Sequence, residues 1–217
     1  MIIKAVFATL IVITSMFSKP FQPQVKSKEN VISSHVMSLE KRYSNSFVND
    51  VFKDNILLTL HYLNGEDYEG DKVDWNKIDK PYNFDLKIQP NSVFAFHDGV
   101  LPQFEGKVAQ TTNVHFNSEE GFKSDGYLVG DGVCHLASLI NWSARDAGLD
   151  VTSPTAHDFA NIPQVPKEFG VSIFAQKNPT TTNLLQNLYI KNNFKKPVVI
   201  KFNFDGTNLK VSVVTTG

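Results

Sequence analysis

Two stretches of the chain space their hydrophobic residues like one face of an α-helix. From about residue 38 the apolar positions recur at intervals of three and four up to Asn64-Gly65, a dipeptide typical of a helix end. A second run of this kind covers residues 133–147 and stops at Gly148. Its expected apolar face consists of Leu136, Leu139, Ile140 and Ala147. The pattern therefore predicts two amphipathic helices, each lying on a core.

Alternation of apolar and polar residues, the period of a β-strand, is found in much of the remaining chain. Residues 82–102 predict one or two strands around a Pro90-Asn91 turn, and residues 165–176 predict another. Further strands are expected around Val114, at 127–129 and within 187–214. The last of these segments contains Asp205-Gly206, a typical hairpin turn. Together the elements predict a single α+β domain in which amphipathic helices pack on a largely antiparallel sheet.

The N-terminal residues 1–18 differ from the rest of the chain. Lys4 is followed by the uncharged and mostly apolar residues 5–17. This arrangement is typical of a signal peptide, and the apolar stretch is shorter than the roughly 20 residues of a membrane-spanning helix. The sequence predicts export, with residues 1–18 either cleaved or kept as an N-terminal anchor. Residues 19–37, rich in Pro, Gln, Lys and Ser, are predicted to be a linker, which leaves residues 38–217 as the domain.

Charge and cysteine content narrow the classes of function. The 217 residues carry 21 Lys and Arg against 22 Asp and Glu, so the chain has no basic field to attract nucleic acid. Membrane contact is expected only through the N-terminal segment. The single cysteine, Cys134, excludes an internal disulfide in an exported chain. Its thiol is therefore free, part of an intermolecular bridge, or buried as a small apolar group.

Cys134 lies where a helix begins after a glycine-rich loop, and this position favours a reactive thiol. The helix dipole and the free N–H groups of the first turn stabilise a thiolate. His157 follows on a later segment and could take the thiol proton, with Asp158 or Asn161 orienting the imidazole. Papain-like and transglutaminase-like enzymes share this order of residues, so the fold around the Cys134 helix could be of that type. The helix face that Cys134 shares with small and polar residues would leave room for substrate; it contains Ala137, Ser138, Asn141 and Arg145.

Other observations favour a structural role for Cys134. Free cysteine is among the most buried residue types and is often inert. Asp131 occupies the position expected for the helix N-cap, and its carboxylate would oppose ionisation of the thiol. Asp158 adjoins His157 in the chain, and consecutive side chains of an extended segment point in opposite directions. Catalytic and structural roles both stay open from the sequence.

Further polar residues are candidates for binding. His97, followed by Asp98 at the end of a predicted strand, could form a third corner of the site, although a solvated turn capped by Gly99 explains the pair better. His135 and Asp131 flank the thiol and could contact a ligand. The closely spaced ligand pairs of structural zinc sites do not occur, so we expect neither a metal nor a cofactor.

Five segments, taken in order, resemble the VanW family. This is a family of bacterial envelope-associated proteins named for a member of some vancomycin-resistance gene clusters. The resemblance spans about residues 42–215. The matching residues are Gly130, Gly132, Val133, Cys134, Ala147, Gly148, Leu149, His157, Val165, Pro166, Asn192, Asn193 and Pro197. The chain departs from the family pattern at three positions: Asp131 stands for glycine, His135 for glutamine and Asp158 for serine.

The resemblance implies a place in the cell envelope, and no established reaction comes with it. We therefore carry two hypotheses. The first is an exported binding or accessory module that associates with peptidoglycan or its precursors. The second is a cysteine hydrolase or transpeptidase that acts on cell-wall peptides, with Cys134 as the nucleophile and His157 as the base.

Overall fold

The fold is α+β, as predicted, and consists of one domain with two sheets. A computed structural model describes residues 29–178 and 180–216, so the predicted signal segment and residues 19–28 lie outside the described part of the chain. The four α-helices of the described residues are α1 (Ser46–Leu63), α2 (Trp75–Ile78), α3 (Val133–Asp146) and α4 (Thr181–Leu185). None of the helices in this part of the chain is long and apolar enough to cross a membrane.

The larger sheet is antiparallel throughout and has the strand order β1-β8-β7-β2. Its strands are β1 (Glu29–Ser38), β2 (Tyr82–Ile88), β7 (Val198–Phe204) and β8 (Asn208–Thr216). The smaller sheet has the order β4-β3-β6-β5, in which only β3 and β4 are parallel. Its strands are β3 (Val93–Ala95), β4 (Val108–Gln110), β5 (Asp150–Thr152) and β6 (Tyr189–Lys191).

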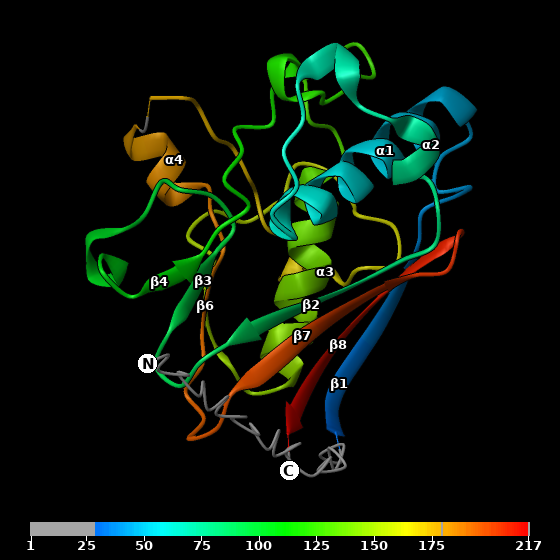
Figure 1. Cartoon of the computed structure of the whole chain (residues 1–217). Helices are drawn as coiled ribbons and strands as arrows, with labels where there is room; N and C mark the ends of the chain where they lie inside the picture. The colour runs from blue at the N-terminus through cyan, green and yellow to red at the C-terminus, as the bar shows by residue number, and fades with distance from the viewer. Residues whose placement is uncertain (1–28, 179, 217) are drawn as a thin grey trace, which may run out of the picture.

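Helix α3 lies at the centre of the molecule. It packs against β1 and β8 of the larger sheet and against β5 of the smaller one, and α1 also contacts it (Figure 1). The predicted apolar face is confirmed, because Leu136, Leu139 and Ile140 are fully buried and Ala147 nearly so. Burial of a large aliphatic side chain contributes about 2 kcal/mol, so this face holds the helix firmly on the core.

Several local signals in the sequence are confirmed. Helix α1 ends at Leu63 before Asn64, and β2 and β3 are separated by the Pro90-Asn91 turn. The hairpin between β7 and β8 turns at Asp205, whose Oδ1 accepts hydrogen bonds from the N–H groups of Thr207 and Asn208. Each of these features depends on interactions between residues close in sequence, which is why a local pattern predicts them.

The predicted start of α1 at about residue 38 is wrong, because the helix begins at Ser46. Asn45 is the N-cap and accepts a hydrogen bond from the N–H of Phe47. The preceding residues form a turn held by Asn49, whose Oδ1 accepts from the N–H groups of Arg42 and Tyr43. Asparagine side chains that bond nearby backbone groups favour caps and turns over helix, which explains the later start.

The predicted linker is also corrected, because residues 29–37 belong to β1. This strand pairs with β8 along its whole length. Its pattern is concealed because Val31 and Val36 face solvent, whereas Ser33 is buried and donates from Oγ to the carbonyl of Ser143 at 2.6 Å. A β-bulge between Val31 and Ser33 further interrupts the alternation. Among the described residues the domain therefore begins at Glu29.

The predicted strand over 165–176 is not formed. A short 3₁₀ helix covers Lys167–Phe169, and the extended residues that follow make only one isolated bridge, between Val171 and Ala156. Val114 also lies outside any strand, and residue 129 makes only an isolated bridge to Ser124. The segment 169–173 runs from the last residue of this 3₁₀ helix into the extended residues, and it bonds to side chains of α3. This contact shapes the candidate site.

Candidate functional site

A glycine-rich turn places Cys134 in the first turn of α3. Gly132 is the N-cap and has a φ of +98°, a conformation that L residues with side chains rarely adopt. The turn also lets the backbone pass close to α1, because a Cβ on Gly132 would lie 2.7 Å from the carbonyl oxygen of Phe52. Glycine at this position therefore brings α3 and α1 together beneath the site.

One face of α3 binds the segment 169–173. Three polar side chains on successive turns of this face each bond the backbone of one residue, and the bonded residues are every second one of the segment. The bonds join Cys134 Sγ to the N–H of Ile173 at 3.4 Å, Ser138 Oγ to the N–H of Val171 at 2.9 Å, and Asn141 Nδ2 to the carbonyl of Phe169 at 2.9 Å. The chain itself therefore covers Ser138 and Asn141 on this face, while open space remains beside Cys134.

A cavity of about 460 Å³ lies at the N-terminal end of α3. Four of the candidate residues line it, namely Asp131, Cys134, His135 and His157. The rest of its wall is mainly apolar and includes the aromatic side chains of Tyr43, Phe52, Phe116, Phe159 and Phe174. The sequence did not indicate these aromatic residues as part of a site, because they are spread from residue 43 to residue 174 and share no motif.

Cys134 has a thiol that resists ionisation. Burial raises its pKa from the ordinary value of 9.0 to about 11, and the charge of Asp131 raises it further, while the N–H of Ile173 acts in the opposite direction. The residue keeps some exposure, but protein atoms surround the sulfur closely. A thiol of this kind is mostly uncharged at neutral pH, whereas a nucleophilic cysteine needs its thiolate.

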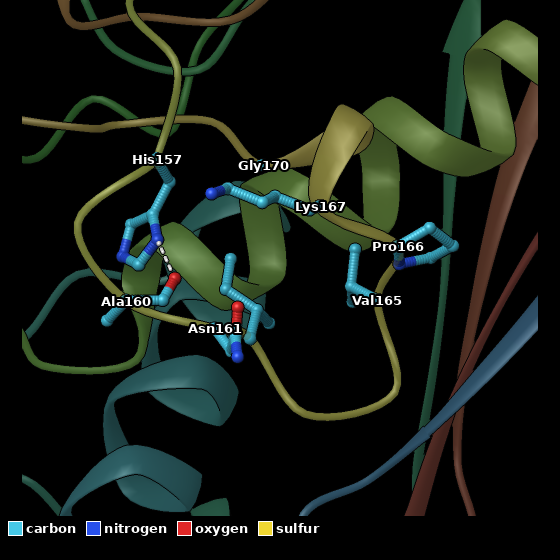
Figure 2. A pocket seen from close by; sticks show the side chains of 8 residues that line it. His157, Ala160, Asn161, Val165, Pro166, Lys167 and Gly170 are labelled. Carbon is cyan, nitrogen blue, oxygen red and sulfur yellow. Dashed lines mark hydrogen bonds between the residues drawn. The ribbon is translucent and has the colours of Figure 1, made fainter.

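The ring of His157 bonds the backbone and not the thiol. Its Nδ1 bonds the carbonyl oxygen of Ala160 at 3.1 Å (Figure 2). The hydrogen bonds of the described residues include none between this ring and Cys134 Sγ. The neighbouring Asp158 is exposed, and no hydrogen bond or ion pair joins its carboxylate to another described residue. His157 also lines a second, smaller cavity of about 240 Å³, together with Asn161 and Lys167 (Figure 2).

His135 is held by an arginine. Nη2 of Arg42 donates to His135 Nδ1 at 3.0 Å, and burial together with this positive charge lowers the pKa of His135 well below its usual value. The guanidinium also donates to the carbonyls of Ser38 and Pro163. Burial lowers the pKa of Arg42 to about 10, so the side chain stays charged at neutral pH. The imidazole of His135 is therefore neutral.

Asp131 is not the helix cap. Its Oδ2 accepts from the N–H of Asp125 at 3.0 Å, so the carboxylate holds the preceding loop instead of α3. Burial raises the pKa of Asp131 to about 6, despite the hydrogen bond from that backbone N–H. The prediction of an N-cap at this position is wrong, because Gly132 begins the helix. The predicted effect of Asp131 on the thiol has the expected direction.

His97 lies outside the lining of the cavity and is completely buried. Its Nε2 donates to the carbonyl of Gln186, and its Nδ1 accepts from the N–H of Gly99. These bonds tie the end of β3 to the segment before β6. No set of three or more His, Cys, Asp or Glu side chains within the described residues is arranged to hold a metal ion.

A family model described as VanW like protein matches residues 84–214, which is more than half of the chain. The chain belongs to the VanW family. No curated protein and no solved structure matches the chain. The residues that the family model matches include α3, the segment 169–173 and the three residues Cys134, His135 and His157. The part of the cavity wall formed by Tyr43 and Phe52 precedes them.

The rate at which Cys134 reacts with an alkylating reagent tests whether its thiol is uncharged in the folded protein. A pKa of about 11 instead of 9.0 leaves about 100-fold less thiolate at pH 8. We expect iodoacetamide to label the folded protein at least about 100-fold more slowly than a free cysteine, with a rate that still rises above pH 9. Cys134 is the only cysteine, so labelling in urea, where the rate should match a free thiol, is the control. Rapid labelling of the folded protein at pH 7 would contradict this assignment.

Proposed function

We propose that this VanW-family protein is exported and acts in the cell envelope as a binding module for peptidoglycan or its precursors. The observation that carries the proposal is the cavity at the N-terminal end of α3. A concave, mostly apolar site with a few polar groups on its wall is the usual form of a ligand site. The cavity has this form, with its aromatic wall, the imidazoles of His115, His135 and His157, and the Cys134 thiol.

The rim of the cavity supports binding. Leu128 is 68% exposed and Phe159 is 74% exposed, and both line the cavity together with the exposed Phe174. Tyr127, next to this rim, is also exposed. Large hydrophobic side chains gathered in solvent around a cavity typically mark a binding site. Contact with a ligand would remove these side chains from water.

Binding fits the polar groups of the cavity better than hydrolysis does. The thiol bonds the backbone of Ile173, and the imidazole of His157 bonds Ala160. A cysteine hydrolase needs the thiol and its base within hydrogen-bond reach and a thiol with a lowered pKa. The proposal of export depends on residues 1–18, and the envelope setting depends on the family.

Co-sedimentation with purified peptidoglycan sacculi tests this function. We expect the wild-type protein to pellet with sacculi. The rim variants Leu128→Ser and Phe159→Ser should each bind about 10-fold more weakly, because each removes roughly 1.5 kcal/mol of apolar contact. Both positions are exposed, so the variants should fold.

The matched controls are Leu185→Ser and Phe47→Ser, which remove hydrophobic side chains that are 44% and 57% exposed but do not line the cavity. These controls should bind like the wild type. Absence of binding by the wild-type protein, or equal binding by rim and control variants, would contradict the proposal. Release of soluble fragments from sacculi that Cys134→Ala abolishes would establish the hydrolase instead.

A further inference from the structure

Two buried imidazoles lie side by side on the wall of the cavity. His135 is 4% exposed and His157 is 5% exposed, and their ring centroids are 6.0 Å apart with the rings nearly perpendicular. One comes from the first turn of α3 and the other from the loop before the segment 169–173. Each ring has one nitrogen bonded to the protein, and that bond fixes which nitrogen carries the proton.

The bond to Arg42 determines the tautomer of His135. A guanidinium can only donate, so Nδ1 of His135 must accept and cannot carry a proton. The neutral ring therefore has its proton on Nε2. A positive charge on the opposite side of the ring withdraws electron density and makes this N–H a stronger donor. His135 thus brings a hydrogen-bond donor to the cavity.

The bond to Ala160 gives His157 the opposite tautomer. A carbonyl oxygen can only accept, so Nδ1 of His157 carries the proton. Burial lowers the pKa of His157, which keeps the ring neutral and leaves a lone pair on Nε2. In Figure 2 the bond to the Ala160 oxygen leaves from the other ring nitrogen, and no bond is drawn to this one. His157 thus brings a hydrogen-bond acceptor.

Both Nε2 atoms are available to a ligand. Within the described part of the chain, neither has a hydrogen-bond partner. Four side-chain polar atoms in that part are fully enclosed by protein and have no hydrogen-bond partner: Arg42 Nε, His61 Nε2, Tyr82 Oη and His115 Nε2. The Nε2 atoms of His135 and His157 are not among them. Both atoms therefore still reach open space, and the cavity is the space that both rings line. Nearly buried polar groups without partners are costly unless something binds them.

We propose that His135 and His157 form a donor–acceptor pair that binds the backbone of one residue of an extended peptide. His135 Nε2–H donates to its carbonyl oxygen, and His157 Nε2 accepts from its N–H. In an extended chain the N–H and C=O of one residue point to the same side, so a donor and an acceptor side by side can bind both. The inference rests on the proposed function and assigns the peptide part of peptidoglycan, not its glycan, to the cavity.

The apolar wall complements a peptide. Phe52 lies 4.9 Å from the His135 ring and Phe159 lies 4.0 Å from the His157 ring, measured between centroids. Aromatic rings beside both imidazoles exclude water from the two hydrogen bonds and therefore strengthen them. The exposed rim residues Leu128 and Phe174 would contact neighbouring side chains of the same peptide.

Calorimetry with two probes tests the inference. One probe is the peptide fraction released from sacculi by an amidase, and the other is the remaining glycan. We expect the peptides to bind and the glycan not to bind. His157→Phe should weaken peptide binding about 10-fold or more, because the peptide N–H loses its acceptor in a nearly buried site. The control His35→Phe changes a histidine that stacks on Trp142 and does not line the cavity, so its binding should be unchanged.

A second measurement needs no substitution. In wild-type protein with ¹⁵N-labelled histidine, NMR should show the Nε2–H tautomer for His135 and the Nδ1–H tautomer for His157. Added peptides should shift both Nε2 signals and leave His35 unchanged. Binding of the glycan alone, or the same tautomer for both rings, would overturn the inference while the proposed function stands. Failure of the wild type to bind intact sacculi would overturn both.

Discussion

Replacing Gly132 with alanine should destabilise the domain by about 3 kcal/mol or more, measured as the free energy of unfolding in urea. The loss has two causes. A φ of +98° is strained for any residue with a Cβ. The new Cβ would also lie 2.7 Å from the carbonyl oxygen and 3.0 Å from the Cα of Phe52. These are backbone atoms of α1, so no side chain can rotate away, and α1 and α3 must separate.

Gly148→Ala separates the two causes. Gly148 also has a positive φ, of +77°, but a Cβ there would meet nothing within 4 Å. This variant should lose only about 1 kcal/mol, the cost of the backbone conformation. Equal losses in the two variants would show that the close approach of α1 and α3 at Gly132 does not contribute to stability.

Elements with strong local signals could be predicted from the sequence. The apolar spacing and the final glycine define α3, and Asp205-Gly206 defines the last hairpin. Strand β1 could not be predicted in this way, because its buried positions include Ser33 and its exposed ones include Val36. Its position depends on pairing with β8, which lies at the other end of the chain. Long-range pairing of this kind leaves no local pattern.

The candidate site also has one part that the sequence predicts and another part that depends on long-range contacts. Cys134 and His135 are adjacent, His157 follows 23 residues after Cys134, and the structure brings all three to one cavity. The aromatic wall depends on the tertiary fold, since Phe52 and Phe174 are adjacent to the site only after α1 and the segment 169–173 pack on α3. The sequence also could not predict which groups these side chains would bond. The thiol and the His157 ring both bond backbone groups, and because any residue type can supply a backbone group, such a partner leaves no signal in the sequence.

Asn55 connects α1 to both ends of the loop that precedes α3. It is fully buried, and its Nδ2 donates to the carbonyls of Lys123 and Asp131 at 2.9 and 2.8 Å. Its Oδ1 accepts from the N–H of Lys123 at 2.8 Å. The loop between these two bonds contains the rim residues Leu128 and Val129. One amide side chain thus satisfies three backbone groups and fixes the wall of the cavity.

Asn55→Ala should therefore destabilise the domain by about 3 kcal/mol. The N–H of Lys123 and the carbonyl of Asp131 lose their partner, the carbonyl of Lys123 keeps only its bond from the N–H of Gly130, and a cavity replaces the amide. We expect the amide hydrogen of Lys123 to exchange faster, and peptidoglycan binding to weaken. The control is Thr59→Ala on the same helix. Thr59 is equally buried, but its Oγ1 bonds only the carbonyl of Asn55 within α1, so about 1 kcal/mol should be lost. Equal unfolding free energies for the two variants would show that contacts other than those of Asn55 hold the loop.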